Sequence, residues 1–342
     1  MLGSLLKRLF GSRASTTPPS APGAATTDPD WIAETLRLQQ QGAHEEVIAR
    51  CHARLAREPD DTNALNLVAA ALLAQGRAQE GIRHLRRAAA LAPSGRAHAH
   101  LADVLAATGD FDGAIAGYRD TIKQKPEDTG TWHKLAALLK ALARYDEAEE
   151  CCRSGLGMEA RHAALKHTLG TVMFEQGRVG EAIAAVRESL ALQPENPVAH
   201  SDLLRMLNYA GGQDALAVYR EHCAWGDRHA AALERSAPPH ANDRDAARRL
   251  RIGYVSPHFR KHAVTFFLES VIRHLDGNRY EVILYADVVR PDEYSQRLQA
   301  HGAAWRSTLG ASDAQMAQTI RDDRVDVLVD LSGHTPGNRL LA

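Results

Sequence analysis

The fold predicted from the sequence is an α-helical solenoid of repeated helix pairs, followed by an incomplete α/β domain built on a parallel sheet. Two observations predict it. Turn residues recur every 33 or 34 positions up to about residue 210, and beyond residue 248 strand-like and helix-like segments alternate. The chain has 342 residues, of which 44% are hydrophobic and 24% are charged, a composition typical of globular proteins with more than one domain.

Turn residues and prolines define the repeat. Glycine or alanine stands at the turn between the two helices of each unit, where glycine tolerates the left-handed conformation that ends a helix. A helix–turn–helix unit of about 34 residues is the tetratricopeptide period. The turn residues are Gly42, Gly76, Gly109, Ala143, Gly177 and Gly211, and the prolines that separate the units are Pro59, Pro93, Pro126 and Pro194.

Five full tetratricopeptide (TPR) repeats are therefore expected over residues 31–195, with a degenerate repeat and transition helices over 196–237. Stacked repeats form one continuous concave face. We expect this groove to bind acceptor proteins or peptides.

Composition argues against several other classes of protein. The net charge of −1 provides no bulk attraction to nucleic acid or to an anionic membrane. No apolar run approaches the ~20 residues that span a bilayer. The four cysteines include no Cys-x-x-Cys pair, which favours reduced thiols in a cytoplasmic protein over a zinc site. Residues 1–30, rich in Ser, Thr, Pro and Ala, are predicted to be a disordered N-terminal segment and linker.

The pattern changes after residue 237. Residues 238–248, with two prolines and a polar stretch, are predicted to be a linker, and 249–342 a partial catalytic lobe. We expect strands at 250–255, 280–285 and 325–331, helices at 263–275, 293–301 and 311–323, and the start of another helix after the last strand. This alternation predicts the beginning of a parallel, doubly wound sheet, and three strands are too few to complete one.

The region after the linker resembles the catalytic region of the protein O-glycosyltransferases, the family of the O-GlcNAc transferases and the SPINDLY-like transferases. The resemblance is carried by "RRLRIGYVSPHFRKHAV", "YEVILYADVVRPDEYSQRL", "AAWRSTL" and "IRDDRVDVLVDLSGHTPGNRLLA", and it extends upstream to "AHSDLLRMLNYAGG". It implies a GT-B fold, in which the first of two Rossmann-like lobes faces the acceptor and the second holds most of the nucleotide sugar. We expect this chain to end within the first lobe, without the nucleotide-binding lobe.

The resemblance implies a glycosyltransferase that moves a sugar from a nucleotide sugar to Ser or Thr of proteins, with the TPR repeats recruiting the acceptor. UDP-GlcNAc is the expected donor and GDP-fucose the alternative; neither a metal nor another cofactor is implied. The chain alone is expected to be inactive, because the nucleotide sugar would need the missing lobe. The alternative is a TPR adaptor, a protein–protein interaction scaffold that carries a vestigial half-domain.

His262 is the first candidate catalytic residue. It lies in "FRKHAV" after the first strand, and ligands bind at the carboxyl ends of the strands in a doubly wound sheet. The resemblance implies an active-site histidine here, and an imidazole suits removal of a hydroxyl proton near neutral pH. The alternative is a histidine that caps or packs the following helix. The chain departs from the family at His258, where aspartate is usual, and at Ala263, where Pro or Ser is usual.

His334 is the second candidate catalytic residue, in "SGHTPGN" after the third predicted strand. A direct role in catalysis and a role in shaping the cleft are equally compatible with its position. Glycines in this turn allow close backbone approach, and free amides before a helix bind anionic oxygens. Asp330 is expected to be structural, and no metal-ligand cluster is present. The predicted substrate-binding residues are Ser256, Pro257, Gly333, Thr335, Gly337 and Asn338.

Overall fold

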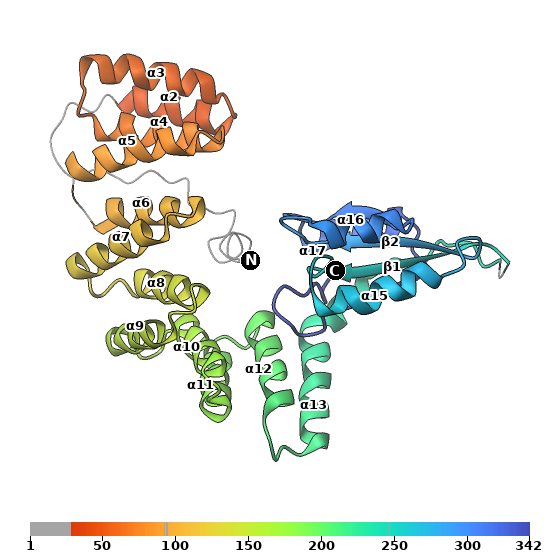
Figure 1. Cartoon of the computed structure of the whole chain (residues 1–342). Helices are drawn as coiled ribbons and strands as arrows, with labels where there is room; N and C mark the ends of the chain where they lie inside the picture. Colours follow the sequence, from red (N-terminus) through yellow and green to blue (C-terminus); the bar gives the residue numbers. More distant parts are fainter. Residues whose placement is uncertain (1–28, 92, 94, 246) are drawn as a thin grey trace. The chain divides into compact units, whose positions relative to one another are not determined.

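The computed structural model describes residues 29–91, 93, 95–245 and 247–342 (Figure 1). Nearly all of the predicted disordered segment 1–30 lies outside the described residues. Packing divides the chain into two units, one up to Arg178 and one from Val179 to the end, and each is described by itself. Within the described residues, no helix is long and apolar enough to cross a membrane.

The first unit is a run of antiparallel helices, which confirms the predicted solenoid. Successive helices approach closely because small side chains lie between them: Ala69, Ala102 and Ala136 are fully buried, one on each of three successive first helices of a repeat. The helices are α2 (Pro29–Gln40), α3 (His44–Arg57), α4 (Thr62–Ala74), α5 (Ala78–Leu91), α6 (Gly95–Thr108), α7 (Phe111–Gln124), α8 (Thr129–Ala141), α9 (Tyr145–Met158) and α10 (Ala163–Glu175).

The predicted turn residues adopt left-handed backbone conformations in the first five units. Four are glycines, whereas Ala143 adopts φ 58°, a conformation that is unfavourable for an L-residue with a Cβ. In the sixth turn the positive φ falls on Gly212 and not on Gly211, the residue that the repeat spacing indicated. The repeat period thus locates each turn to within one residue.

The second unit begins with helices and continues into a sheet. Asn196 caps α12 by accepting hydrogen bonds from the amides of Val198 and Ala199, and Pro197 occupies the first helical position. A π-helical segment, η1 (Gly226–Ala230), joins two helices after α12. The helices before the sheet are α11 (Val179–Leu192), α12 (Pro197–Tyr209), α13 (Ala215–Trp225) and α14 (Ala231–Ser236).

The sheet has four parallel strands in the order β3-β2-β1-β4. Sequence analysis anticipated β1 (Leu250–Ser256), β2 (Tyr280–Ala286) and β4 (Val327–Asp330) but missed β3 (Ala304–Ser307). The missed strand has four residues, "AWRS", and its last two are exposed, so it shows no apolar run. The predicted helix after β4 is also wrong: residues 331–342 form turns.

Helices cover both faces of this sheet, as in a doubly wound fold. On one face, α15 (Ala263–His274) and α16 (Glu293–Ala300) bury Leu268 and Leu298 against Leu284 and its neighbours. On the other face, α17 (Asp313–Asp322) packs Met316 and Ile320 against Val255, Ile283 and Tyr285. Adjacent residues of β2 therefore point into two different cores.

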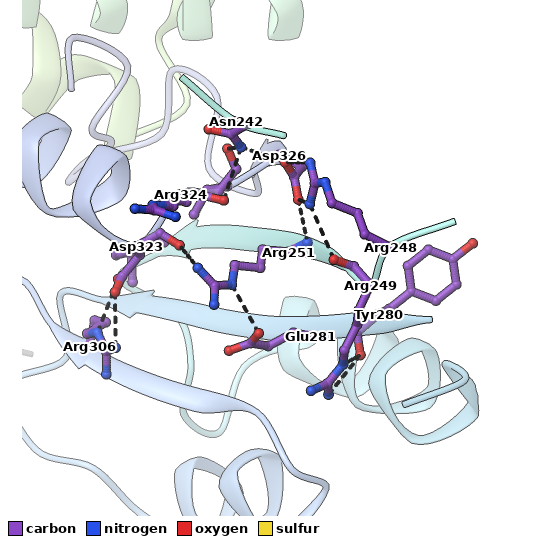
Figure 2. A network of polar contacts seen from close by, with 12 residues as sticks. Asn242, Arg248, Arg249, Arg251, Tyr280, Glu281, Arg306, Asp323, Arg324 and Asp326 are labelled. Atoms are coloured by element: carbon purple, nitrogen blue, oxygen red, sulfur yellow. Dashed lines mark hydrogen bonds and ion pairs between the residues drawn. The ribbon is translucent and has the colours of Figure 1, made fainter. Parts of the chain in front are cut away.

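A network of polar contacts at the amino ends of the strands holds the predicted linker against the sheet (Figure 2). The carboxylate of Asp326, only 7% exposed, accepts both terminal nitrogens of the Arg248 guanidinium and the backbone N–H of Arg251, the latter at 2.8 Å. The amide of Asn242 donates to the same carboxylate and to the carbonyl of Val325. These contacts hold the pKa of Asp326 far below its usual range, chiefly through the bond from Arg248.

Replacing Ala143 by glycine is expected to stabilise the protein by about 1 kcal/mol. The left-handed conformation costs an L-residue about 1–2 kcal/mol, part of which is offset by the greater freedom of glycine in the unfolded chain. Ala53, exposed within α3, is the matched control: Ala53→Gly should destabilise by up to ~1 kcal/mol. Denaturant unfolding followed by circular dichroism measures both, and a destabilising Ala143→Gly would contradict the expected strain.

Replacing Asp326 by alanine is expected to lower the free energy of unfolding by about 2 kcal/mol or more, because several hydrogen bonds to a charged acceptor are lost together. Asp322→Ala, at an exposed position of α17, should change it by less than about 0.5 kcal/mol. Amide hydrogen exchange of β1 and β4 measures the effect locally. If the two substitutions lower the free energy of unfolding equally, the contacts of Asp326 do not stabilise the sheet.

Candidate functional site

The strand order creates a topological switch point between β1 and β4. The chain passes from β1 through β2 to β3 on one side, and then returns to pair β4 with the other side of β1. Ligands bind outside the carboxyl ends of strands at such points, because the two following loops diverge there. Val255 pairs with Asp330 at this edge, and the hydroxyl oxygens of Ser256 and Ser332 lie 3.5 Å apart. The structure therefore brings together the two loops that carry the predicted site residues.

His262, in the loop after β1, is the N-cap of α15. Its Nδ1 accepts a hydrogen bond from the backbone N–H of Val264 at 3.2 Å, and its backbone is extended, as N-cap residues require. The capping role that sequence analysis considered as the alternative is therefore present. A cap uses only one ring nitrogen, so the second nitrogen remains for chemistry.

The ring of His262 stacks on the ring of His258. The ring centroids are 4.0 Å apart and the planes are inclined by 9°. Two positive charges at this separation would repel by about 4 kcal/mol at an effective dielectric constant of 20, so the two rings are not charged together. Burial, followed by the charges of His262 and Arg260, lowers the pKa of His258 to about 4. Burial and Arg260 also lower the pKa of His262.

The start of α16 anchors this loop. Asp292 caps α16 and accepts the backbone N–H of Lys261 at 2.8 Å, while Ser295 donates its hydroxyl to the carbonyl of Phe259 at 2.6 Å. Burial alone would raise the pKa of Asp292, but the amides of Lys261, Ser295 and Tyr294 outweigh it and hold the pKa below its ordinary value. The hydroxyl of Thr265 also donates to the carbonyl of His258 at 2.6 Å. The position of the two histidines is thus determined by contacts on either side of them.

The turn after β4 is closed by its own polar groups. Asp330 accepts the backbone N–H groups of Ser332 and Gly333, at 3.2 and 2.5 Å, so it has the structural role expected for it. Thr335 donates its hydroxyl to the carbonyl of Ser332, and Asn338 donates its amide to the carbonyl of Thr335. The backbone amides of Gly333, Thr335 and Asn338 all have partners within the turn, unlike the free amides that sequence analysis assumed for anion binding. Gly333 and Gly337 adopt positive φ angles of 51° and 85°.

His334 contacts the helical hairpin formed by α12 and α13, which precedes the sheet. Its Nδ1 lies 3.1 Å from the hydroxyl oxygen of Ser201 on α12. Its ring meets the ring of Trp225 edge-on at 5.0 Å and the ring of His222 at 5.1 Å, both on α13. Burial, with smaller contributions from His222 and His200, lowers the pKa of His334 to about 4. A neutral imidazole therefore joins the loop after β4 to α12 and α13.

A second pair of imidazoles, His200 and His229, lies at this hairpin. His200, 1% exposed, lies with Nδ1 3.1 Å from Nε2 of His229 and with Nε2 3.3 Å from the carboxylate of Glu221. Trp225 contacts both groups of histidines, since its ring lies 5.5 Å from the ring of His229 and 5.0 Å from the ring of His334. These contacts link α12, through His200, to Glu221 on α13 and to His229 in η1.

The structure separates the predicted substrate-binding residues into two groups. Ser256 is 1% exposed, and its hydroxyl accepts a hydrogen bond from the backbone N–H of His258. Its side chain therefore stabilises the loop after β1 and is not available to a substrate. Pro257 and the turn residues Gly333, Thr335, Gly337 and Asn338 are at least partly exposed at the switch point. Their contact with a substrate stays a prediction. Among the described residues, no group of His, Cys, Asp and Glu has the arrangement of a metal site.

Sequence reasoning missed Ser201, Trp225 and Ser332. Trp225 lies in "EHCAWGDRHA", where a lone tryptophan on a polar helix was a usable signal. Ser201 and Ser332 carry no such signal, because a buried serine resembles any helix or turn serine until the packing is known.

Comparisons with known proteins agree on the two parts of the chain. Residues 179–341 match the model of glycosyl transferase family 41, and residues 72–139 and 133–197 match tetratricopeptide repeat models. The family 41 match covers nearly the same residues as the second structural unit, so it includes α11 to α14 as well as the sheet.

Two plant relatives are named "Probable UDP-N-acetylglucosamine--peptide N-acetylglucosaminyltransferase SPINDLY". The rice protein is 34% identical over 164 residues, which cover 46% of this chain and 17% of the relative. The Arabidopsis thaliana protein is 31% identical over 156 residues, with 44% and 17% covered. A solved structure of a mutant Thermobaculum terrenum O-GlcNAc transferase is 32% identical with a TM-score of 0.64, and the match covers 73% of this chain and 48% of that one.

The docking of His334 is expected to weaken as the pH falls. In the native protein the pKa of His334 is about 4, whereas in the unfolded chain it has the ordinary value of about 6.5. At a pH between these two values the ring is neutral in the native protein and protonated in the unfolded chain. The unfolded state binds more protons between these values, so the stability from this group is complete above pH 6.5 and is lost as the pH falls toward 4.

The free energy of unfolding should therefore fall less between pH 7 and pH 5 in His334→Asn than in the unchanged protein, by up to about 1 kcal/mol for a partly solvated ring. Asparagine keeps a polar group toward Ser201 but does not titrate. His240→Asn, at an exposed position before the sheet, is the control. A pH dependence that is the same in all three proteins would show that His334 is not protonated on unfolding.

Proposed function

Because residues 179–341 match the model of glycosyl transferase family 41, we propose that this protein transfers a sugar from a nucleotide sugar to Ser or Thr side chains of other proteins. The observation that carries the proposal is the switch point between β1 and β4, where the loops of His262 and His334 meet next to a parallel sheet. This is where a doubly wound lobe binds the reacting ends of its substrates.

UDP-GlcNAc is the donor we propose, with GDP-fucose as the alternative. Support comes from the names of the plant relatives and of the bacterial structure, all of which refer to GlcNAc transfer. The chain spans only part of each of these proteins, so the donor is assigned by analogy of the family. His262 and His334 are the residues that we propose contact the reactants, and transfer in this proposal needs no metal.

The TPR repeats are proposed to recruit the acceptor protein. Their in-phase units build one solenoid, and such surfaces bind extended peptides along the concave side. Buried alanines between successive helices allow the repeats of the first unit to stack closely. In this proposal, binding of the acceptor to the repeats raises its local concentration near the site without additional contacts there.

Transfer is tested with a chimera in which residues 1–342 are followed by the part of the Thermobaculum terrenum enzyme that this chain does not match. Radiolabelled UDP-GlcNAc and GDP-fucose are offered side by side, and transfer from UDP-GlcNAc is expected. His262→Ala should lower turnover by about 10²-fold, the usual effect of removing a group that stabilises the transition state. His274→Ala, at the exposed far end of the same helix, should leave turnover unchanged. Transfer that His262→Ala does not affect would remove His262 from the site.

Recruitment is tested by deleting residues 31–128, which removes about three repeats. The apparent KM for a protein acceptor should rise about 10-fold or more, because multivalent contacts are lost, whereas kcat for a short Ser-containing peptide should stay the same. An unchanged KM for the protein acceptor would assign recruitment to another part of the protein.

A further inference from the structure

The cap on α15 determines which ring nitrogen of His262 carries hydrogen. Nδ1 of His262 accepts the backbone N–H of Val264, and a nitrogen that accepts a hydrogen bond has no proton. A neutral imidazole has one N–H, so in this arrangement the hydrogen is on Nε2. Nε2 can then donate a hydrogen bond, but it has no lone pair with which to remove a proton.

The surroundings of His262 favour the neutral ring. His258 lies parallel to it at 4.0 Å, and Arg260 adds positive charge to the same loop. Protonation on Nδ1 would also break the bond to Val264 and uncap the helix. The charged form is therefore opposed by partial burial, by the positive charge of Arg260 and by the loss of a cap.

His258 holds the ring of His262 in this orientation. The stack is close and nearly parallel, and Thr265 fixes the carbonyl of His258 from the start of α15. Among the described residues, nothing bonds to Nδ1 of His258, which is buried. A buried ring nitrogen without a hydrogen-bond partner lowers the stability of the fold. A role of the His258 ring in orienting His262 would explain why it is kept.

We propose that His262 acts through Nε2–H as a hydrogen-bond donor to an oxygen of the bound substrate, and that His258 is the positioning residue that keeps its ring correctly oriented. The proposal rests on the proposed transferase function for the identity of the substrate, but the tautomer is a property of this chain alone. It replaces the proton-accepting role that the sequence indicated for His262. The proton of the acceptor hydroxyl is not taken by His262.

The tautomer is tested on the 342-residue chain by nitrogen NMR of ¹⁵N-labelled histidine at pH 7, with His262→Gln to identify the signal. Nε2 of His262 is expected to be protonated and Nδ1 unprotonated. A spectrum with the proton on Nδ1, or with both nitrogens protonated, would overturn the proposal. No transferase activity is needed, so this result is independent of the proposed function.

The role of His258 is tested in the same spectra by titration. His258→Asp places a carboxylate next to His262 and should raise the pKa of His262 by about 1–3 units. His274→Asp, at the other end of α15, should leave that pKa unchanged. If His258→Asp also leaves the pKa of His262 unchanged, His258 does not position it.

Two substitutions of matched size test the chemistry in the active chimera. His262→Gln supplies an amide N–H near the position of Nε2 but cannot act as a base, whereas His262→Glu supplies a base but not a donor when ionised. Both lose the cap on α15 to a similar extent. A donor role predicts that Gln retains at least about 10-fold more turnover than Glu; the opposite ranking would restore the base. Absence of transfer by every variant and by the parent would instead contradict the proposed function.

Discussion

The central position of β1 is the constraint on which the candidate site depends. Because β1 pairs with β2 on one side and β4 on the other, all in parallel, the loops after these strands leave from the same edge of the sheet. At the opposite edge, Asp326 ties the beginning of β4 to the backbone of Arg251 at the beginning of β1. The register of β1 with β4 is therefore fixed at both ends, and with it the distance between the two loops that carry histidines.

The histidines of the site share one electrostatic property. Burial is the first cause of the lowered pKa at His258, His262 and His334, and neighbouring histidines or Arg260 act in the same direction. Such imidazoles are neutral near pH 7 and interact by hydrogen bonds and ring contacts, not as cations. In each case one nitrogen or one ring face is used for structure: a helix cap, a ring stack, or a contact with Ser201. Structural and chemical roles of the same ring therefore constrain each other.

The helical hairpin before the sheet belongs physically to the site. Ser201 places a hydroxyl and Trp225 an indole ring against His334, and the buried His200 precedes Ser201 on the same helix. The family 41 match begins at residue 179, upstream of this hairpin, which agrees with the packing. A lobe of this kind is thus a sheet with its preceding helices attached and not the sheet alone.

The sequence by itself determined the solenoid, the alternation of strands and helices, and the family resemblance, because each depends on local periodicity or on short motifs that can be recognised in a single sequence. The spacing of Gly42 to Gly177 located the left-handed turns, and the stretches around His262 and His334 located the two loops. Only the tertiary structure decided the strand order, the short strand β3, and the partners of the histidines. Strand order depends on contacts between segments far apart in sequence, and the tautomer of His262 depends on a hydrogen bond whose geometry a sequence does not specify.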